Sequence, residues 1–430
     1  MISFLNRLAV ILLSLLSPLT TISQPPNGQS YRAFYNNPEH AGCEPVCNAD
    51  VHYDHDWLSC FDDFSCVSDI QEKLKSNEAL IEYHFTDSAF LVLCVSHESF
   101  VIGSHNLTPW FWIAMKAFRN KMKSADLGDY VSLGQAMYTV LISPLMDFLN
   151  GKNRLIIIPG VLTGIPFEAF ISEVDSPKSN RPAHIRFLVA DFEIIYNYSP
   201  AIWADLFEKR DKEPGRPSDQ PEFAFAGFSP VFRDHPTLTP LPDSRLEIEK
   251  IDSMFVKHGM MSIIANDTES KESSFKKLAG NTRIIHLATH SITNRAVPEA
   301  CGLLFWGYQL KPGCDSMQDG VLTGEEIMKL KLKADLIVLN TCGSGMGQVI
   351  AGRSTFPLTW HFLKAGAKNI LSSLWNVTDY MAGQFMIGFY RNWLKGQTYS
   401  EALRKVKLDL IGNPQTSLPS IWAPYILVGQ

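Results

Sequence analysis

The sequence predicts an α/β fold in which a mainly parallel sheet is flanked by helices. Short apolar runs rich in β-branched residues, such as Leu155–Ile158, are typical of strands buried on both faces of a parallel sheet. Segments with apolar residues at helical spacing lie between these runs. This alternation indicates βαβ units. The chain has 430 residues, of which 46% are hydrophobic, so it can form a large core and is not a disordered chain.

The predicted elements follow one another from residue 81 onward. A hairpin is expected first, with strands Ile81–Thr86 and Phe90–Val95. Buried strands are expected next at Leu155–Ile158, Phe223–Ala226, Ile284–Leu287, Leu336–Leu339 and Ile370–Leu374. Helices are expected at Trp110–Met122, Leu133–Leu149, Asp243–His258, Glu272–Leu278, Thr323–Lys329, Thr355–Leu363 and Met381–Leu394.

A charged, proline-rich stretch, Lys209–Glu222, predicts an exposed linker within the chain. We therefore divide the chain into a leader (residues 1–23), a short cysteine-rich N-terminal segment (24–80), a first α/β half (81–210), a linker (211–222) and a second α/β half (223–430). The 38 basic and 44 acidic residues give a net charge of -6, which argues against nucleic acid as a partner.

The leader has the features of a secretory signal peptide. Arg7 precedes the apolar run Leu8–Leu16, and small residues provide a cleavage site near Ser23 and Gln24. An uncleaved anchor is the alternative, although the run is shorter than the ~20 residues that span a bilayer. We expect an exported protein, secreted or held in the periplasm or cell envelope, with no membrane span after cleavage.

Export favours disulfides among the eight cysteines. Two disulfides with open pairing are expected in the cysteine-rich segment, among Cys43, Cys47, Cys60 and Cys66. Zinc is an alternative, but the last two of these cysteines are widely spaced for a zinc finger, and free thiols are the third possibility. Cys301 and Cys314 flank one loop and could form a third bridge. Cys94 is expected to be a buried, inert thiol, which leaves Cys342.

Two predicted strands end in reactive side chains. His290 follows the strand at Ile284–Leu287, and Cys342 follows the strand at Leu336–Leu339. Functional groups of a doubly wound sheet gather beyond the carboxyl ends of its strands. An imidazole beside a thiol can take its proton and so supply a thiolate nucleophile. The Gly-Ser-Gly run after Cys342 would let a substrate carbonyl approach backbone N–H groups. The pattern predicts a His–Cys catalytic dyad.

Two other kinds of site fit the same residues less well. His286 and His290 are four apart, like metalloprotease ligands, but they lack the intervening glutamate. They also lie on a predicted strand, along which four residues span about 13 Å. The glycines at 343, 345 and 347 faintly resemble a dinucleotide-binding loop, without the acidic residue that such a loop requires. We therefore expect no metal and no cofactor.

Short motifs follow one another through most of the chain. They are Leu155–Pro159, Ile165–Phe170, Tyr198–Pro200, Leu241-Pro242 before Glu247–Glu249, His286–His290, Asp319–Thr323, Asn340–Gly345, Ala365–Ala367, Ser373–Trp375, Trp422-Ala423 and Leu427–Gly429. Together these motifs resemble the CHAT domain of the caspase, gingipain and separase clan of cysteine peptidases. The resemblance runs from about residue 81 to residue 430 and implies a caspase-like fold.

The resemblance also implies roles for individual residues. His290 would be the base, Cys342 the nucleophile, and backbone N–H groups of Ser291, Cys342 and Gly343 the oxyanion donors. The family usually has glycine where this chain has Ser291, and an acidic residue where it has Gly343. If residue 291 needed a positive φ, serine there would cost about 1 kcal/mol and weaken the oxyanion hole.

Asp379 and Trp375 fall where related peptidases line the pocket for the substrate side chain before the scissile bond. A carboxylate at Asp379 would favour Arg or Lys in that pocket. The alternative role of Asp379 is to cap the helix at Met381–Leu394.

These inferences predict an exported caspase-like cysteine endopeptidase that hydrolyses peptide bonds. Its partners would be a protein or peptide substrate and a regulatory protein. The alternative is a catalytically weak or inactive CHAT protein that binds peptides or serves as a scaffold, and the departures at Ser291 and Gly343 motivate it.

Overall fold

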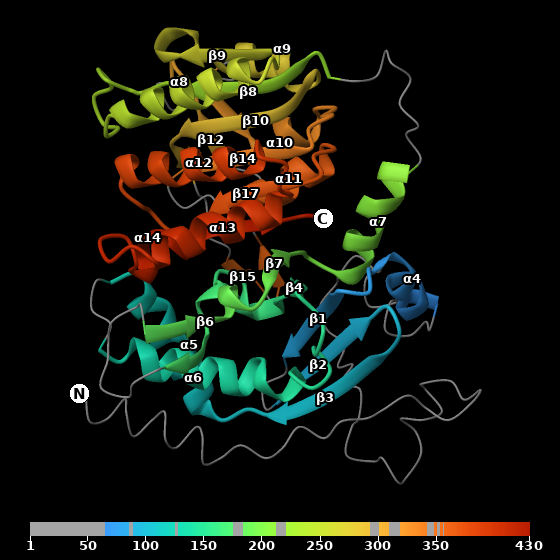
Figure 1. Ribbon diagram of the computed structural model, residues 1–430. Coiled ribbons are helices and arrows are strands. Elements are labelled where there is room, and N and C mark those ends of the chain that lie inside the picture. The colour runs from blue at the N-terminus through green and yellow to red at the C-terminus, as the bar shows by residue number, and fades with distance from the viewer. Residues whose placement is uncertain are drawn as a thin grey trace.

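The computed structural model describes residues 65–85, 89–124, 128–174, 184–211, 221–292, 301–308, 319–341, 348–350, 353–355 and 357–430. Over these residues the chain forms the α/β structure that the sequence predicts, built on one long, mostly parallel sheet (Figure 1). The described strands of this sheet have the order β3-β2-β1-β4-β7-β18-β17-β14-β10-β8-β9.

The second half of the chain forms the part of the sheet whose strands precede the predicted dyad residues in the chain. Its strands are β8 (Phe223–Ser229), β9 (Ser262–Asn266), β10 (Thr282–Thr289), β14 (Leu336–Thr341), β17 (Ile370–Ser373) and β18 (Tyr425–Val428). Neighbours from β9 to β17 run parallel, and β18 runs antiparallel to β17. Strand β9 lies on one side of β8, and the next strand in the chain, β10, lies on the other side of β8. The boundary between β8 and β10 is therefore a topological switch point, where open α/β sheets bind their ligands.

The first half extends the same sheet. Its strands are β1 (Glu78–Phe85), β2 (Ala89–Ser96), β3 (Phe100–Asn106), β4 (Arg154–Ile158) and β7 (Glu193–Tyr196). Helices α5 (Pro109–Met122) and α6 (Tyr130–Leu141) pack on one face of these strands, and α4 (Ser65–Lys73) and α7 (Pro200–Asp211) pack on the other. The two halves meet where β7 pairs with β18, with Tyr196 opposite Val428.

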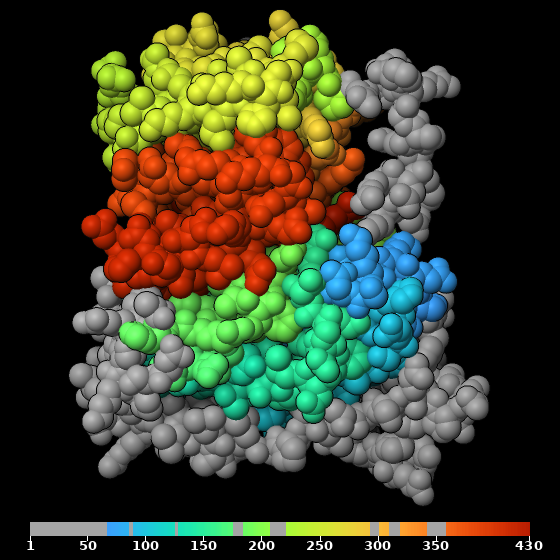
Figure 2. Space-filling model, in the orientation of Figure 1, coloured from blue at the N-terminus to red at the C-terminus, as the bar shows by residue number. Residues whose placement is uncertain are grey.

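Helices cover both faces of the second half as well. Helices α8 (Pro242–Lys257), α12 (Asp379–Trp393) and α13 (Tyr399–Ile411) lie side by side on one face, and α12 and α13 form the red band in Figure 2. Helices α9 (Glu272–Ala279), α10 (Gly324–Met328) and α11 (Pro357–Lys364) cover the other face. The alternation of β8 explains this arrangement, because Phe225 packs on α8 and α12 whereas Phe228 packs on Phe275 of α9.

Short elements complete the described structure. They are the 3-10 turns Ser143–Leu145, Gly160–Leu162, Phe167–Ala169, Leu188–Ala190 and Asp267–Glu269, the strands β5 (Ile171–Val174), β6 (Ile185–Phe187), β11 (Ser291–Ile292), β12 (Gly302–Leu304), β13 (Val321–Thr323), β15 (Gln348–Ile350) and β16 (Arg353–Thr355), and helix α14 (Pro419–Trp422). Strands β11, β12 and β13 form a small antiparallel sheet directly after β10.

Two predicted helices differ from the structure. The helix expected at Leu133–Leu149 ends at Leu141, because Pro144 cannot continue an α-helix and the chain turns into a 3-10 turn there. Thr355, expected to open a helix, instead ends β16, and α11 begins at Pro357, since proline suits the first turn of a helix. The other predicted helices and strands lie within a few residues of their observed bounds.

Several predictions concern residues outside the described ranges. They are the leader, Cys43, Cys47, Cys60, the side chain of Cys66, Cys314, and residues 212–220 of the linker, so the disulfides and the signal peptide stay predictions. Cys94 is buried as expected, and Cys301 is buried too. Across the residues that the structure covers, we find no helix long and apolar enough to cross a membrane.

Candidate active site

Strands β10 and β14, which precede the two predicted dyad residues in the chain, end at the same edge of the sheet. The two strands are parallel neighbours, and their last registered pair is Thr289 opposite Thr341. Neighbouring strands lie about 4.8 Å apart, so these two backbone positions are adjacent. The next residues in the chain are His290 and Cys342. Residues 342–347 lie outside the described ranges, so the described part of the dyad is His290 and the strand end that precedes Cys342.

His290 is partly exposed at the switch point, and the segment that follows β8 holds it. Its Nε2 lies 2.7 Å from the carbonyl oxygen of Thr239. The ring of Phe232 packs on the imidazole, with 5.3 Å between the ring centroids. A carbonyl can only accept, so Nε2 carries the proton in this contact, and Nδ1 is the nitrogen that remains able to accept one.

The segment after β8 has a strained backbone. Val231 and Phe232 have φ values of 57° and 56°, in the left-handed region that β-branched and bulky residues rarely adopt. Both side chains are buried, and the Val231 carbonyl accepts a hydrogen bond from the Leu241 N–H at 2.8 Å. Such strain persists only where the surrounding structure fixes it, and it clusters at functional sites. Here it shapes the loop that carries Thr239 to His290.

Ser291 does not adopt the backbone conformation that would make serine costly. The described non-glycine residues with positive φ are Val231, Phe232 and Asp267, and Ser291 is not among them. It forms β11 and lies opposite Leu303 of β12. The Leu304 N–H donates to the His290 carbonyl at 2.9 Å, so His290 and Leu304 form a hydrogen-bonded pair. Because such pairs alternate along an antiparallel ladder, the next pair, Ser291 and Leu303, is a non-hydrogen-bonded one. The Ser291 N–H is therefore directed away from β12.

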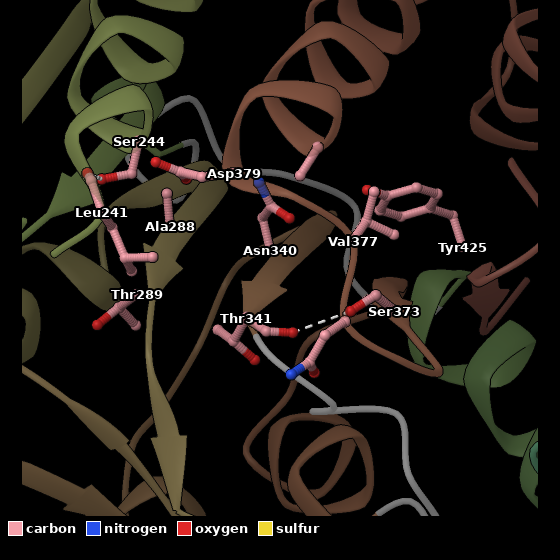
Figure 3. A pocket seen from close by; sticks show the side chains of 12 residues that line it. Leu241, Ser244, Ala288, Thr289, Asn340, Thr341, Ser373, Val377, Asp379 and Tyr425 are labelled. Atoms are coloured by element: carbon pink, nitrogen blue, oxygen red, sulfur yellow. Dashed lines mark hydrogen bonds between the residues drawn. The ribbon is translucent and has the colours of Figure 1, made fainter. Parts of the chain in front are cut away.

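A pocket opens at the carboxyl ends of β10, β14 and β17 (Figure 3). Its walls come from the sheet and from the N-terminal ends of α8 and α12. The lining residues are Leu241, Ser244, Ala288, Thr289, Asn340, Thr341, Ser373, Asn376, Val377, Asp379, Ala382 and Tyr425. Ser373 Oγ donates to the Thr341 carbonyl at 2.9 Å and so ties the end of β17 to the end of β14.

Asp379 lines this pocket and also caps a helix, although not the helix that the sequence suggests. It is the first residue of α12, after the N-cap residue Thr378. Its Oδ2 accepts the backbone N–H of Asp243 at 2.7 Å, at the N-terminal end of α8. Burial raises the pKa of the Asp379 carboxyl to about 6, and the negative charges of Glu247 and Asp243 add to the rise. Asp379 is thus an acid whose charge changes close to neutral pH.

Asn340 and Glu247 join α8 to the end of β14. Asn340 Nδ2 donates to Glu247 Oε1 at 3.0 Å and to Oε2 at 2.8 Å. Glu247 is buried, and His286 Nε2 lies 2.9 Å from its Oε1. The other ring nitrogen of His286 lies 3.2 Å from the Tyr390 hydroxyl. His286 is therefore a core residue that faces α8 and α12, and it does not share a site with His290.

Sequence reasoning missed the supporting residues of this site. Thr239 acts through its backbone carbonyl, which leaves no signal in the sequence. Glu247 begins the motif Glu247–Glu249, but nothing in that motif indicates its contact with Asn340. Trp375 is buried beside the pocket without lining it, and its indole N–H donates to the Ser420 carbonyl at 3.1 Å. The predicted oxyanion donor Gly343 lies outside the described residues, as Cys342 does.

Over 116 residues the chain is 33% identical to Tetratricopeptide repeat protein 28 of Homo sapiens and 31% identical to the protein of the same name in Mus musculus. These matches cover 27% of this chain and 5% of each relative, so the chain shares a small part of their length.

Two crystal structures of the Saccharomyces cerevisiae separase–securin complex are similar in fold. Their TM-scores are 0.52 and 0.50, at 11% sequence identity, over 85% of this chain and 30% and 31% of those chains. At that identity the likeness shows the fold alone, which is the caspase-like α/β fold. The sequence model of the CHAT domain matches residues 131–430, which is more than half of the chain. The protein therefore belongs to the CHAT domain family.

Proposed function

We propose that the protein is a cysteine endopeptidase whose nucleophile is Cys342 and whose base is His290. The observation that carries this proposal is the register of β10 and β14, which sets Thr289, the residue before His290, opposite Thr341, the residue before Cys342. The contact of His290 Nε2 with the Thr239 carbonyl supports it, because that contact leaves Nδ1 as the proton acceptor.

The chemistry needs one proton acceptor and one nucleophile. His290 would take the thiol proton of Cys342, and the thiolate would attack the carbonyl carbon of the scissile peptide bond. The protonated imidazole would then give its proton to the leaving amine as the C–N bond breaks. Water, deprotonated by the same imidazole, would release the acyl group from the sulfur as a carboxylic acid and restore the thiol. Backbone N–H groups at Ser291, Cys342 and Gly343 would bind the oxyanion.

We propose further that the pocket at Asp379 receives a basic side chain of the substrate. A carboxylate in a partly dry pocket pairs well with a guanidinium or ammonium group. The N-terminal ends of α8 and α12 form the mouth of the pocket, and Asp243 adds a second negative charge close to Asp379. The pocket is lined by Thr289 and Thr341, which precede His290 and Cys342 in the chain, so the substrate residue before the scissile bond would extend into it.

The test is covalent labelling with a peptidyl chloromethyl ketone that ends in lysine or arginine, followed by intact mass measurement. We expect one adduct on the wild-type protein and none on Cys342→Ala. We expect labelling of His290→Ala to be at least about 100-fold slower, the usual contribution of a general base. Cys94→Ala is a matched control that should label normally, because burial raises the pKa of the Cys94 thiol and keeps it unreactive.

Labelling that persists in Cys342→Ala would overturn the dyad. Labelling of Cys342 without any cleavage of peptides would instead favour the second candidate, a peptide-binding CHAT protein with weak or no turnover. The strain argument for that candidate loses force, because Ser291 does not have a positive φ.

We also propose that the protein is exported and acts on a protein or peptide, with a regulatory protein as a possible partner. The motivation is the apolar run that follows Arg7 near the start of the chain. Expression with and without residues 1–23, followed by fractionation and N-terminal sequencing, tests the export. Recovery of the full-length chain inside the cell, starting at Met1, would contradict it.

A further inference from the structure

A buried carboxylate beneath the pocket has no role in the dyad chemistry. Glu247 is 1% exposed, on the face of α8 that packs against α12 and the sheet. A carboxylate removed from water is unfavourable unless hydrogen bonds and charge compensate it. Its described partners are the Asn340 amide and His286. The first of these partners lines the pocket.

The carboxylate of Glu247 fixes which way the Asn340 side chain faces. An ionised carboxylate only accepts hydrogen bonds, so the Asn340 amide must present its nitrogen to both oxygens of Glu247. If the amide turned over, its own oxygen would face two carboxylate oxygens. Asn340 Oδ1 must therefore lie on the other side, and Figure 3 shows it on the side of the pocket-lining residue Val377.

His286 lies on the other side of the carboxylate. Its Nε2 is 2.9 Å from Glu247 Oε1 and makes no aligned hydrogen bond among the described residues, so this contact does not orient the carboxylate. The ring is held between Phe225 and Tyr390 in the core. The directional partner of Glu247 is therefore Asn340.

We propose that Glu247 is a positioning residue of the pocket, which holds Asn340 so that its Oδ1 serves, in addition to Asp379, as an acceptor for the cationic group of a ligand. The inference rests on the basic-residue pocket of the proposed function. It adds that specificity at this pocket depends on a residue that the ligand never touches. A glutamine at position 247 would remove the constraint, because its amide can donate to Asn340 Oδ1 as readily as it accepts from Nδ2.

The experiment measures binding of benzamidine, a small amidinium cation, by isothermal titration calorimetry. Binding does not need Cys342, so the result is independent of turnover. The titration is run at about pH 8, where Asp379 with its pKa of about 6 is ionised in every variant. We expect Glu247→Gln to weaken binding about tenfold, which is the loss of one hydrogen bond to a charged group.

The matched control is Glu168→Gln. Glu168 is also buried, at 2% exposed, but it pairs with Lys407, and neither residue lines the pocket. Both variants remove a buried carboxylate and both should lower the melting temperature. Only the variant at Glu247 should change the affinity for benzamidine. Equal losses of affinity in the two variants would mean a general effect of destabilisation and would overturn the proposal.

A double-mutant cycle separates positioning from the charge of Glu247. Asn340→Leu removes Oδ1 and should weaken binding by about the same factor as Glu247→Gln. Adding Glu247→Gln to Asn340→Leu should then change the affinity less than about twofold, because Glu247 acts through Asn340. A full tenfold loss in that background would show action through charge and overturn the proposal. Should Glu247→Gln fail to fold, wild-type affinity in Asn340→Leu alone would overturn it.

The outcomes also separate this inference from the proposed function. If the wild-type protein does not bind benzamidine, the pocket does not receive cations and the inference fails, whereas labelling of Cys342 still decides the peptidase. If Cys342 does not label but the affinity depends on Glu247 and Asn340 as described, the inference stands without the peptidase.

Discussion

Glu168 and Glu247 are both almost completely buried, yet their surroundings differ. Glu168 Oε1 lies 2.7 Å from the ammonium group of the equally buried Lys407, and its Oε2 accepts the Tyr196 hydroxyl. Glu247 has no lysine or arginine within ion-pair distance among the described residues, and its partners are Asn340 and His286. One carboxylate is matched by a fixed cation, and the other is not.

The difference follows the position of each residue in the fold. Glu168 and Lys407 connect a 3-10 turn of the first half to α13 of the second half, so their ion pair ties the two halves together. Glu247 lies under the pocket, and its charge contributes to the raised pKa of Asp379. The first carboxylate joins two halves of the fold, whereas the second holds the side chain of the pocket-lining residue Asn340.

The largest expected effect is a loss of stability when the ion pair of Glu168 and Lys407 is broken. Lys407→Met removes the ammonium but keeps the length of the side chain, so Glu168 would be left buried beside the Tyr196 hydroxyl alone. We expect the free energy of unfolding in urea to fall by about 3–5 kcal/mol, the usual result of breaking a buried ion pair. Lys407→Met combined with Glu168→Gln should recover part of this loss. A loss below about 1 kcal/mol would mean that the pair does not hold the halves together.

Removing the hydroxyl of Tyr196 or of Tyr390 should have smaller effects on the free energy of unfolding, and these effects should differ between the two sites. Tyr196→Phe removes a hydroxyl that donates to Glu168 and accepts the Phe167 N–H at 2.7 Å, so it leaves two buried groups without that partner. We expect it to cost about 2–3 kcal/mol. Tyr390→Phe removes a hydroxyl whose described hydrogen-bond contact is His286 at 3.2 Å, and we expect about 1 kcal/mol or less. Thermal unfolding of both variants measures the ranking, and the reverse order would contradict the contrast.

The pH dependence of cation binding sharpens the contrast at the pocket. Asp379 has a pKa of about 6, raised first by burial and then by the charges of Glu247 and Asp243 on α8. Protonation below that pH removes the negative charge, so benzamidine binding should weaken about tenfold from pH 7 to pH 5. Glu247→Gln should move the midpoint to lower pH, because it removes one of the charges that raises this pKa. Glu168→Gln should leave the midpoint unchanged, and Asp379→Asn should abolish the pH dependence.

Much of the fold could be predicted from the sequence because its central strands are buried on both faces. The apolar runs at β4, β10 and β14 carry that signal directly. The strand β9 was not predicted, because it is the edge strand and most of its residues are only half-buried. The helix α13 was missed as well, since its apolar stripe is interrupted by Lys407, whose burial is explained only by Glu168 in the other half.

The sequence predicts the residues of the candidate site whose side chains would carry out the chemistry. It does not predict the residues that support them through tertiary contacts. His290 and Cys342 follow apolar strands and so are visible in the sequence. The link between Glu247 and Asn340 joins residues 93 positions apart, and no local pattern indicates it. The role of Asp379 as a cap for α8 is invisible for the same reason, because the capped helix lies 136 positions earlier in the chain.

The smallest expected effect concerns Ser291, where this chain departs from its family. Its φ is not positive, and β11 holds its backbone against β12, so serine is not strained and glycine would relieve nothing. We expect Ser291→Gly to change the rate of Cys342 labelling less than about twofold and to cost about 0.5–1 kcal/mol through the flexibility of glycine in a strand. Chloromethyl ketone labelling and thermal unfolding measure both quantities. A gain above tenfold in labelling would mean that the serine side chain itself restrains the site.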